Sequence, residues 1–353
     1  MNIKVLSIEE WNSHPAVEVS FPENKKDAPM YRLEAGWYHG DLCLPILSDG
    51  SVCIDAFRWL HRTKYIQFFE TLKSMELPHP DNTKITEIMQ KKDCLIFYGS
   101  HVYYHFIVDC LGTLQIPPLS SVLLNRSIVI SKNLPPKYKK FLLEILQAHG
   151  CEEPNFIPTA FMFFPFKDSF IQAQPSNAEK IDNVRHLVSK IDIGPTPDSQ
   201  RIFVLRGQTQ RRNLLNEREL ASMLIKDFGF SVVDPSKLSM KEQMRCFKNA
   251  NIIVGVHGGG LTNALFANNL QVLVEMFNSE TRSHLPFISK QLGAKHFYLK
   301  ANSVETLNRQ LIRLEDDKDM TISLQSAKKF FRLLFFGKFD SLGTSQPLLI
   351  DLT

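Results

Sequence analysis

Three consecutive glycines follow a run of apolar residues in the second half of the chain. Ile252–Val256 is typical of a buried strand, and a short helix is expected to begin after Gly260. Glycines let a ligand approach the main chain closely, and free N–H groups at the start of a helix attract an anion. The segment predicts a phosphate-binding loop, with a tight turn that needs positive φ angles as the alternative. The predicted loop consists of His257, Gly258, Gly259, Gly260, Leu261, Thr262 and Asn263.

A cluster of arginines follows another predicted strand, 201–205. Arg206, Arg211 and Arg212 lie close together in the sequence, and Asn213 comes directly after them. A guanidinium group binds phosphate oxygens through two N–H groups at once. Because ligands bind at the carboxyl ends of parallel strands, we expect these four side chains to join the glycine loop in binding a nucleotide. A solvated charged loop is the alternative.

The glycine segment also partly matches the fingerprint of dinucleotide-binding proteins. Gly258 and Gly260 have the spacing of G-x-G-x-x-G, but Asn263 stands where the last glycine belongs. Glu275 ends the next predicted strand, where an acidic residue binds ribose hydroxyls. The fingerprint normally opens its domain, whereas two predicted strand–helix units precede it here. An NAD-type oxidoreductase and a non-catalytic nucleotide-binding module stay open as alternatives.

Two histidines and an aspartate recur at every fourth residue in the first half. His101, His105 and Asp109 lie in a predicted helix, 101–114, and this spacing places them on one face. A histidine and a carboxylate one turn apart can provide a general base with an orienting partner. We therefore predict that Asp109 and His105 are catalytic, and that Asp109 either takes the proton itself or orients His105 to take it. Metal ligation by the two histidines and a purely structural polar face are the alternatives.

Two segments near the C-terminus suggest other uses. Asp317-Lys318-Asp319 has the D-x-D pattern that can hold a nucleotide-bound cation, but it follows a charged turn instead of an apolar strand. We expect a surface turn there, no metal site and no cofactor. Lys328–Phe336 is basic and aromatic, which predicts either a closing helix or a helix in peripheral contact with a membrane surface.

Strands and helices alternate along the chain, most regularly in the second half. This order predicts an α/β protein with parallel sheets covered by helices. A segment rich in proline, glycine and polar residues, 194–199, is the best candidate for a linker. We expect an N-terminal α/β domain on the acceptor side (1–193), a nucleotide-binding Rossmann-like domain (200–315) and a C-terminal helix and tail (316–353).

The composition limits the class of protein. The chain has 353 residues and a formal net charge of +4, which is too mild for a dedicated nucleic-acid binder. It contains no run of 18 apolar residues, and its first residues read as a strand, not as a signal peptide. Six cysteines are scattered without a C-x-x-C pair. We therefore expect a cytoplasmic protein.

Taken together, these motifs resemble the glycosyltransferase 61 family over about residues 95–280. The first matching segment is Tyr104-His105-Phe106 with Asp109, and the second runs from Arg206 to Asn216-Glu217. The third is the glycine loop leading to Glu275. In this loop Gly259 stands where the family usually has alanine, which is a conservative difference. The first 90 residues match no segment of the family.

The resemblance implies a GT-B-like architecture, in which two Rossmann-like domains face each other across a cleft and a C-terminal helix closes back on them. It implies an inverting, metal-independent transfer from a nucleotide-sugar, commonly a UDP-sugar held by the C-terminal domain. The acceptor would be a saccharide or a lipid-linked saccharide. Without secretory targeting, the chain resembles bacterial members that build capsule, other surface polysaccharides or lipopolysaccharide at the inner face of the membrane.

Overall fold

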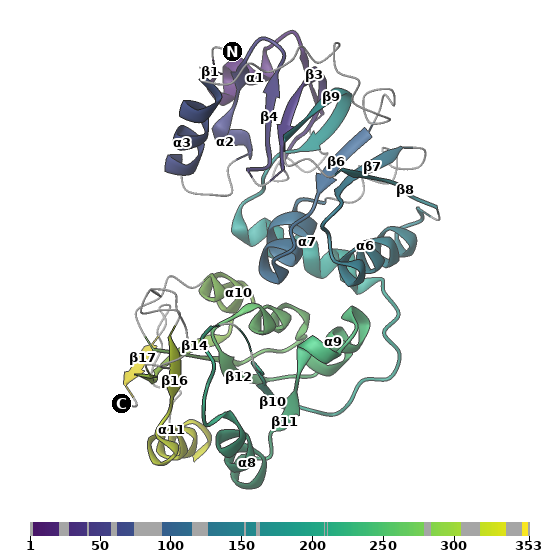
Figure 1. The fold of residues 1–353 in the computed structure, drawn as a ribbon. Helices are drawn as coiled ribbons and strands as arrows, with labels where there is room; N and C mark the ends of the chain where they lie inside the picture. Colours follow the sequence, from purple (N-terminus) through teal and green to yellow (C-terminus); the bar gives the residue numbers. More distant parts are fainter. Residues whose placement is uncertain are drawn as a thin grey trace. The chain divides into compact units, whose positions relative to one another are not determined.

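The computed structural model divides the chain into two compact units, Met1–Ile191 and Asp192–Thr353 (Figure 1). Each has its own hydrophobic core, and each is described by itself. The domain boundaries expected from the sequence stay predictions. The structure describes residues 3–20, 28–40, 42–57, 62–73, 94–114, 126–151, 153–159, 163–207, 209, 211–278, 284–304, 318–336 and 348–351.

The first unit is built on a mixed sheet whose strands run in the order β2-β3-β9-β6-β7-β8, with β4 paired to β3. The expectation of a parallel sheet is wrong for its first part, because β3 pairs antiparallel with β2, β4 and β9. Only β9, β6, β7 and β8 are parallel. The strands are β2 (Val17–Ser20), β3 (Met30–His39), β4 (Leu44–Leu47), β6 (Cys94–Tyr98), β7 (Ser127–Ser131), β8 (Asn155–Thr159) and β9 (Phe163–Gln172).

Short elements at the N-terminus complete this core. Trp11 and Phe57 are fully buried and meet edge to face, with ring centroids 5.7 Å apart. This aromatic packing joins two of the small helices to the sheet. The elements are β1 (Lys4–Val5), α1 (Ile8–Asn12), β5 (Ser51–Val52), α2 (Ile54–Phe57) and α3 (Arg62–Lys73).

Two longer helices follow the start and stop signals in the sequence. The helix α6 (Pro136–Ala148) begins at a proline and ends before Gly150. The helix α7 (Asn177–Ser189) begins with a capping box, in which Ser176 and Glu179 each accept a hydrogen bond from the other's main-chain N–H. The helix predicted at 101–114 is instead a π-helix, η2 (His105–Cys110), and a 3₁₀ turn, η3 (Leu111–Thr113).

The second unit contains a parallel sheet with strands in the order β11-β10-β12-β13-β14-β17. The chain starts at β10, moves outward to β11 and returns to β12 on the other side. The strand order therefore reverses between β10 and β12, which is where open parallel sheets bind ligands. The strands are β10 (Arg201–Val204), β11 (Ser231–Val233), β12 (Ile252–Val256), β13 (Val272–Phe277), β14 (Lys295–Lys300) and β17 (Leu348–Asp351).

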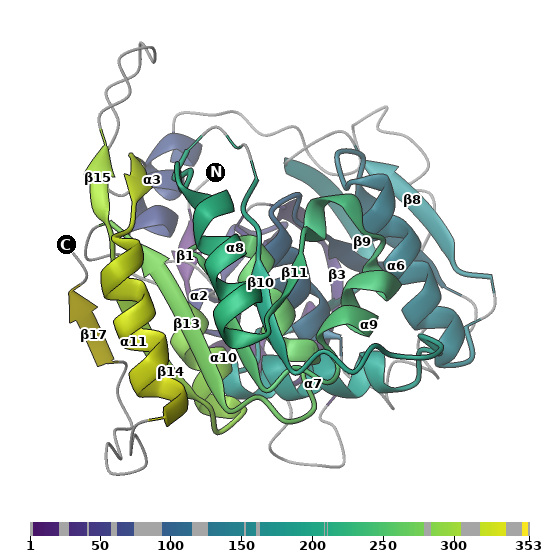
Figure 2. The same ribbon diagram turned by 90° about the horizontal axis from the view of Figure 1, so that it is seen from below.

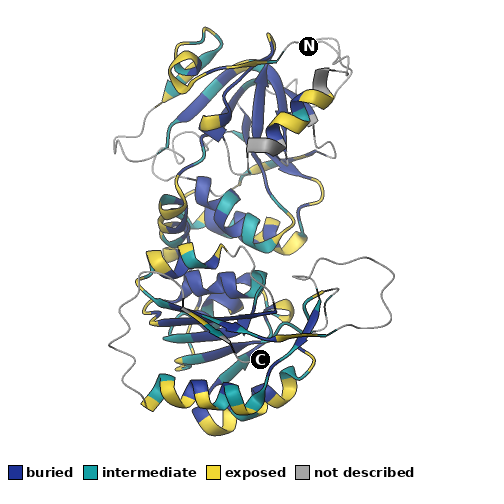
Figure 3. Ribbon diagram, turned by 90° about the vertical axis from the view of Figure 1, so that its left-hand side faces the viewer, coloured by how far each residue is buried: buried dark blue, intermediate teal, exposed yellow. Residues whose placement is uncertain are grey.

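Helices cover both faces of this sheet. Figure 2 shows α8 (Glu217–Phe228) and α11 (Leu324–Phe336) side by side over one face. Figure 3 shows buried strands in each unit and helices that expose their outward sides. A helix is present near the C-terminus as predicted, and Phe330 and Phe331 of this helix, α11, are buried in the core of the second unit. That this helix closes back on both domains stays a prediction. The other elements are η4 (Pro235–Lys237), α9 (Met240–Phe247), η5 (Gly259–Phe266), α10 (Leu285–Gln291), β15 (Asn302–Val304) and β16 (Asp319–Thr321).

Two global expectations can be compared with this structure. All six cysteines are free thiols. Among the residues that the structure describes, no helix is both long enough and apolar enough to cross a lipid bilayer.

Candidate functional site

The two segments that the sequence singled out in the second half meet at the reversal point of the parallel sheet. Strands β10 and β12 are paired in register, with Val204 opposite Gly255. Arg206 follows the first strand and His257 follows the second. The Nη1 atom of Arg206 donates a hydrogen bond to the main-chain oxygen of His257 at 2.9 Å. The arginine loop and the glycine loop are thus joined directly.

The glycine at 258 is explained by this junction. Its φ angle of 162° is extended backbone, and none of the three glycines lies in the left-handed region of positive φ that favours glycine. The alternative of a turn that needs positive φ is therefore wrong. A Cβ atom at Gly258 would instead clash with Nη1 of Arg206, and one at Gly260 would lie 3.1 Å from a methyl group of Val204. The glycines permit close approach, here by the protein's own arginine.

The main chain of the arginine loop is held by Glu217 at the start of α8. Its carboxylate accepts hydrogen bonds from the N–H groups of Arg206, at 2.7 Å, and Gly207, at 3.2 Å. Burial raises the pKa of Glu217, and this effect outweighs the lowering by the two hydrogen bonds. Glu217 is not among the site residues predicted from the sequence. The available signal was an acidic residue in the first turn of the helix that follows the loop.

The guanidinium group of Arg206 is fixed within the same loop. Its Nε and Nη2 atoms donate to the main-chain oxygen of Arg211, at 3.3 and 3.1 Å. The residue Arg211 is exposed, whereas Arg212 is half-buried and has a φ angle of 59°. Three arginines predicted to bind phosphate therefore lie in one loop, and Arg206 anchors this loop to the glycine segment.

Asn213 has a structural task in this loop. Its side chain accepts a hydrogen bond from the N–H of Thr209, and its Nδ2 atom donates to Asp319 at 2.9 Å. The main-chain N–H of Asn213 donates to the same Asp319 oxygen. The expectation that Asp319 lies in a surface turn is wrong, since it is 3% exposed and lies in β16, where these hydrogen bonds satisfy it. Asp317 of the same pattern lies outside the described residues.

The rest of the glycine loop is packed inside the unit. The predicted helix is present as the 3₁₀ helix η5, and the side chains of Leu261, Thr262 and Asn263 are buried. Asn263 donates to Gln243 of α9 at 2.9 Å and to the oxygen of Gly260 at 3.0 Å. These three side chains therefore hold the loop in place.

Glu275 is the buried side chain that His257 contacts. It is fully buried, and its two carboxylate oxygens contact Nδ1 of His257 and Nε2 of His296. Burial raises the pKa of this carboxyl group, but hydrogen bonds and charges from the two histidines outweigh that effect and lower it overall. A ribose contact by Glu275 stays a prediction, and these two imidazole partners are contacts that the sequence analysis did not foresee.

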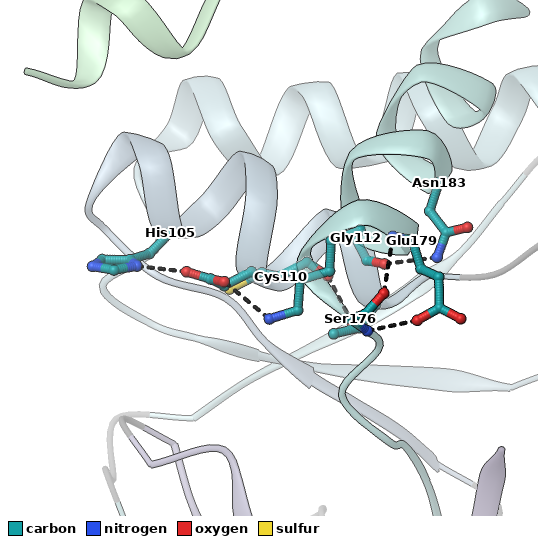
Figure 4. A network of polar contacts seen from close by, with 9 residues as sticks. His105, Cys110, Gly112, Ser176, Glu179 and Asn183 are labelled. Carbon is teal, nitrogen blue, oxygen red and sulfur yellow. Dashed lines mark hydrogen bonds and ion pairs between the residues drawn. The ribbon is translucent and has the colours of Figure 1, made fainter. Parts of the chain in front are cut away.

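The first unit brings together the predicted histidine–aspartate pair and a third residue. Nδ1 of His105 lies 2.7 Å from one carboxylate oxygen of Asp109, and Nζ of Lys180 lies 3.0 Å from the other (Figure 4). Asp109 is 12% exposed and Lys180 is 4% exposed. Burial raises the pKa of Asp109, but His105 and Lys180 outweigh it, so that the pKa lies below its usual value. The sequence analysis missed Lys180, which lies on α7.

Local packing explains how Lys180 reaches Asp109. A Cβ atom at Gly112 would lie 2.7 Å from the Cβ of Lys180, so the glycine allows α7 to approach closely. Asn183, one turn further along α7, donates to the oxygen of Gly112 at 2.9 Å (Figure 4). His101 precedes the π-helix and is exposed, so it does not extend the polar stripe as predicted. Within the described ranges, no three histidine, cysteine or acidic side chains are grouped so that they could hold a metal ion.

Comparison with known proteins identifies a family for the part of the chain that carries these residues. The model of the glycosyltransferase 61 family matches residues 103–274, which include both the histidine–aspartate pair and the glycine loop. This region of the chain, residues 103–274, is a glycosyltransferase 61 domain. The resemblance deduced from the motifs is thereby confirmed.

Curated relatives of this domain share a shorter region with the chain. The EGF domain-specific O-linked N-acetylglucosamine transferase of Gallus gallus is 33% identical over 103 residues, which are 27% of this chain and 19% of the relative. The protein of the same name from Mus musculus is 32% identical over 103 residues, covering 27% and 20%. The one from Drosophila melanogaster is 29% identical over 109 residues, covering 30% and 21%. The matched region thus spans about a fifth of the length of these relatives.

Proposed function

We propose that the protein transfers a sugar from a nucleotide-sugar to an acceptor hydroxyl, with inversion at the sugar carbon. The observation that carries this proposal is the junction of Arg206 with the glycine loop at the reversal point of the parallel sheet. The glycosyltransferase 61 domain at residues 103–274 supports it. In the dinucleotide fold the glycine fingerprint follows the first strand, whereas here it follows β12, the third strand of its sheet, which argues against an oxidoreductase. The GT-B architecture expected from the resemblance is part of the proposal.

The donor in this proposal is a UDP-sugar, bound without a metal ion. Transfer leaves a nucleoside diphosphate, whose developing negative charge must be stabilised. Arg206 and Arg212 supply positive charge, and the N–H groups of the glycine loop supply hydrogen bonds. The relatives are named as N-acetylglucosamine transferases, so UDP-N-acetylglucosamine is the first donor to test.

The acceptor proton goes to His105 in this proposal. Both oxygens of Asp109 already have partners, since His105 contacts one and Lys180 the other. Of the two roles expected for Asp109, orienting the histidine is therefore better supported than taking the proton. The acceptor oxygen bonds to the sugar carbon, the bond to the diphosphate breaks, and the hydroxyl proton moves to His105.

The acceptor class follows the family resemblance. We propose a saccharide hydroxyl, either free or lipid-linked, in a bacterial surface polysaccharide, and we place the reaction in the cytoplasm. Peripheral membrane contact would involve α11, where Leu333 is 49% and Phe336 82% exposed beside the exposed Arg332. The names of the relatives make a hydroxyl of an EGF domain the competing acceptor.

Donor binding tests the proposal most directly. Thermal unfolding would be followed with UDP-, GDP-, CMP- and dTDP-sugars, each in EDTA and each with Mn²⁺. We expect UDP and a UDP-sugar to raise the Tm equally under both conditions, and the sugar to be transferred with inverted configuration. Binding that is lost in EDTA and restored by Mn²⁺ would contradict metal independence. Reduction of bound NAD⁺, or nucleotide binding without transfer to any saccharide or EGF-domain acceptor, would contradict the transferase.

A further inference from the structure

A chain of buried hydrogen bonds leads from the glycine loop into the interior of the second unit. It begins at Nδ1 of His257, passes through both oxygens of Glu275 and reaches Nε2 of His296, 3.1 Å from the second oxygen. The Nδ1 atom of His296 then lies 2.9 Å from Oγ of Ser289 on α10. The contacts cross three adjacent strands, β12, β13 and β14, and end on a helix that covers the sheet.

His257, at the loop end of this chain, is the most exposed of its four residues. The side chain of His257 is 20% exposed, that of His296 is 4% exposed and that of Glu275 is not exposed. A buried carboxylate is stable only when hydrogen bonds compensate for its lost hydration, and here both oxygens are compensated by imidazole nitrogens. The carboxylate therefore has a partner on the loop side and an anchor on the opposite side.

His257, at which this chain begins, is fixed at three points. Its main-chain N–H donates to the oxygen of Met276 at 2.8 Å, its main-chain oxygen accepts from Arg206, and its Nδ1 contacts Glu275. No other described residue hydrogen-bonds to Nε2, and the side chain of His257 is 20% exposed. When one imidazole nitrogen is bound to a carboxylate, the proton state and direction of the other are set by that contact.

We infer that Glu275, anchored by His296 and Ser289, is a positioning residue that holds His257 so that its Nε2 faces the donor diphosphate. This inference rests on the proposed function. Nδ1 of His257 donates to Glu275, and Nε2 takes up a second proton when the diphosphate binds and donates to a phosphate oxygen. Among the residues that the structure describes, the charged groups that contact His257 are Glu275 at the ring and Arg206 at the main-chain oxygen. Glu275 compensates for the positive charge of the ring in the bound state.

The structural part of the inference is tested without any ligand. ¹H–¹⁵N correlation spectra of the imidazole nitrogens report which nitrogen of His257 carries the proton. In the wild-type protein we expect Nδ1 to be protonated, and in Glu275→Gln we expect a mixture of tautomers. Glu219→Gln, the same change at an exposed position on α8, is the matched control. Identical His257 spectra in the wild-type protein and Glu275→Gln would overturn the positioning role.

The functional part is tested with UDP and with turnover. We expect UDP to produce a doubly protonated His257 in the wild-type protein but not in Glu275→Gln. The kcat of Glu275→Gln should fall about tenfold to a hundredfold, as for the loss of a charge-assisted hydrogen bond, while the donor KM changes less than about threefold. Glu275→Asp, which retains the charge, should recover part of the lost kcat.

A double variant separates the positioning role from a direct contact of Glu275 with the donor. If Glu275 acts through His257, Glu275→Gln should have no further effect in a His257→Asn background. If the losses of kcat from the two substitutions multiply instead, the inference is overturned in favour of ribose binding. The same conclusion follows if Glu275→Gln reduces the preference for UDP over its 2′,3′-dideoxy analogue equally in both backgrounds. A wild-type protein that binds no nucleotide-sugar would refute the proposed function instead, while the ligand-free spectra would still decide the positioning of His257.

Discussion

Two buried carboxylates in this chain share one arrangement. Asp109 lies between His105 and Lys180, and Glu275 lies between His257 and His296. In each case both oxygens have a partner, so the orientation of a partly exposed histidine is fixed by a buried anion. Spacing along one helix revealed the pair His105–Asp109. Lys180 is 71 residues from Asp109, and His296 is 21 residues from Glu275, so no local pattern could reveal them.

The roles of His105 and Asp109 predict different losses of turnover. A general base contributes about 10²–10⁴-fold, so His105→Gln should lower kcat by that order. Asp109→Asn should cost about tenfold to a hundredfold, the equivalent of one charge-assisted hydrogen bond. Steady-state kinetics and UDP titration would measure both effects, with UDP affinity nearly unchanged. Glu153→Gln, at an exposed position of the same unit, is the control. Near-normal kcat in both variants would place the base elsewhere.

The same carboxylate makes stability depend on pH. Although burial opposes it, contact with His105 and Lys180 lowers the folded-state pKa of Asp109 from its ordinary value of 3.8. The stability that Asp109 contributes is therefore present above about pH 3.8 and is lost as the pH falls through the folded-state value. Urea unfolding of the wild-type protein and Asp109→Asn between pH 7 and pH 3 should show a difference that shrinks at the acidic end. A constant difference would mean that the carboxylate is not stabilised in its charged form.

At the scale of elements, the site depends on how closely β10 and β12 approach each other. Gly255 belongs to β12, and a Cβ atom there would lie 3.1 Å from the main-chain oxygen of Val204. Beyond the strand ends, Arg206 crosses over Gly258 to reach the oxygen of His257. The sequence predicted that both loops would share one sheet edge. It could not show that one loop would hold the other, because this contact joins residues 51 positions apart.

Replacing Gly258 should therefore act through Arg206. In Gly258→Ala the new methyl group displaces the flexible end of the arginine side chain, so the fold should survive while the guanidinium group leaves His257. Loss of one charge-assisted contact predicts about tenfold to hundredfold weaker UDP binding, similar to Arg206→Ala. Isothermal titration would measure this. Gly259→Ala, which introduces the residue usual in the family, is the matched control and should bind UDP normally. Equal affinity in both variants would contradict the proposed role of the junction.

At the scale of the whole chain, the sequence predicted the second unit better than the first. Alternation of strands and helices identified its parallel strands, because short apolar runs are followed by helices with start signals, as at β11 and α9, where Ser239 and Glu242 form a capping box. In the first unit, β3 and β9 pair antiparallel across more than a hundred residues. Strand direction at that separation depends on tertiary packing, and apolar runs such as β4 fit either direction. The mixed sheet could not be predicted for this reason.

The second unit should function as an independent nucleotide-binding module. The segment 194–199 expected to be a linker and the residue before it are tied to this unit. Arg245 donates to the oxygen of Ile193 at 2.7 Å, and Asn249 donates to Thr196 at 3.0 Å. The unit also has its own aromatic and aliphatic core around β12, β13 and α11.

A fragment of residues 192–353 should therefore fold cooperatively and bind UDP within about threefold of the affinity of the whole chain, because the diphosphate-binding groups proposed above all lie in it. Circular dichroism during thermal unfolding and UDP titration would test this, and the fragment should show no transfer, since His105 and Asp109 are absent. A fragment that starts at residue 200 is the control: it lacks the contacts of Ile193 and Thr196 and should unfold at a lower temperature. If fragment 192–353 folds but does not bind UDP, the donor site must include residues of the first unit.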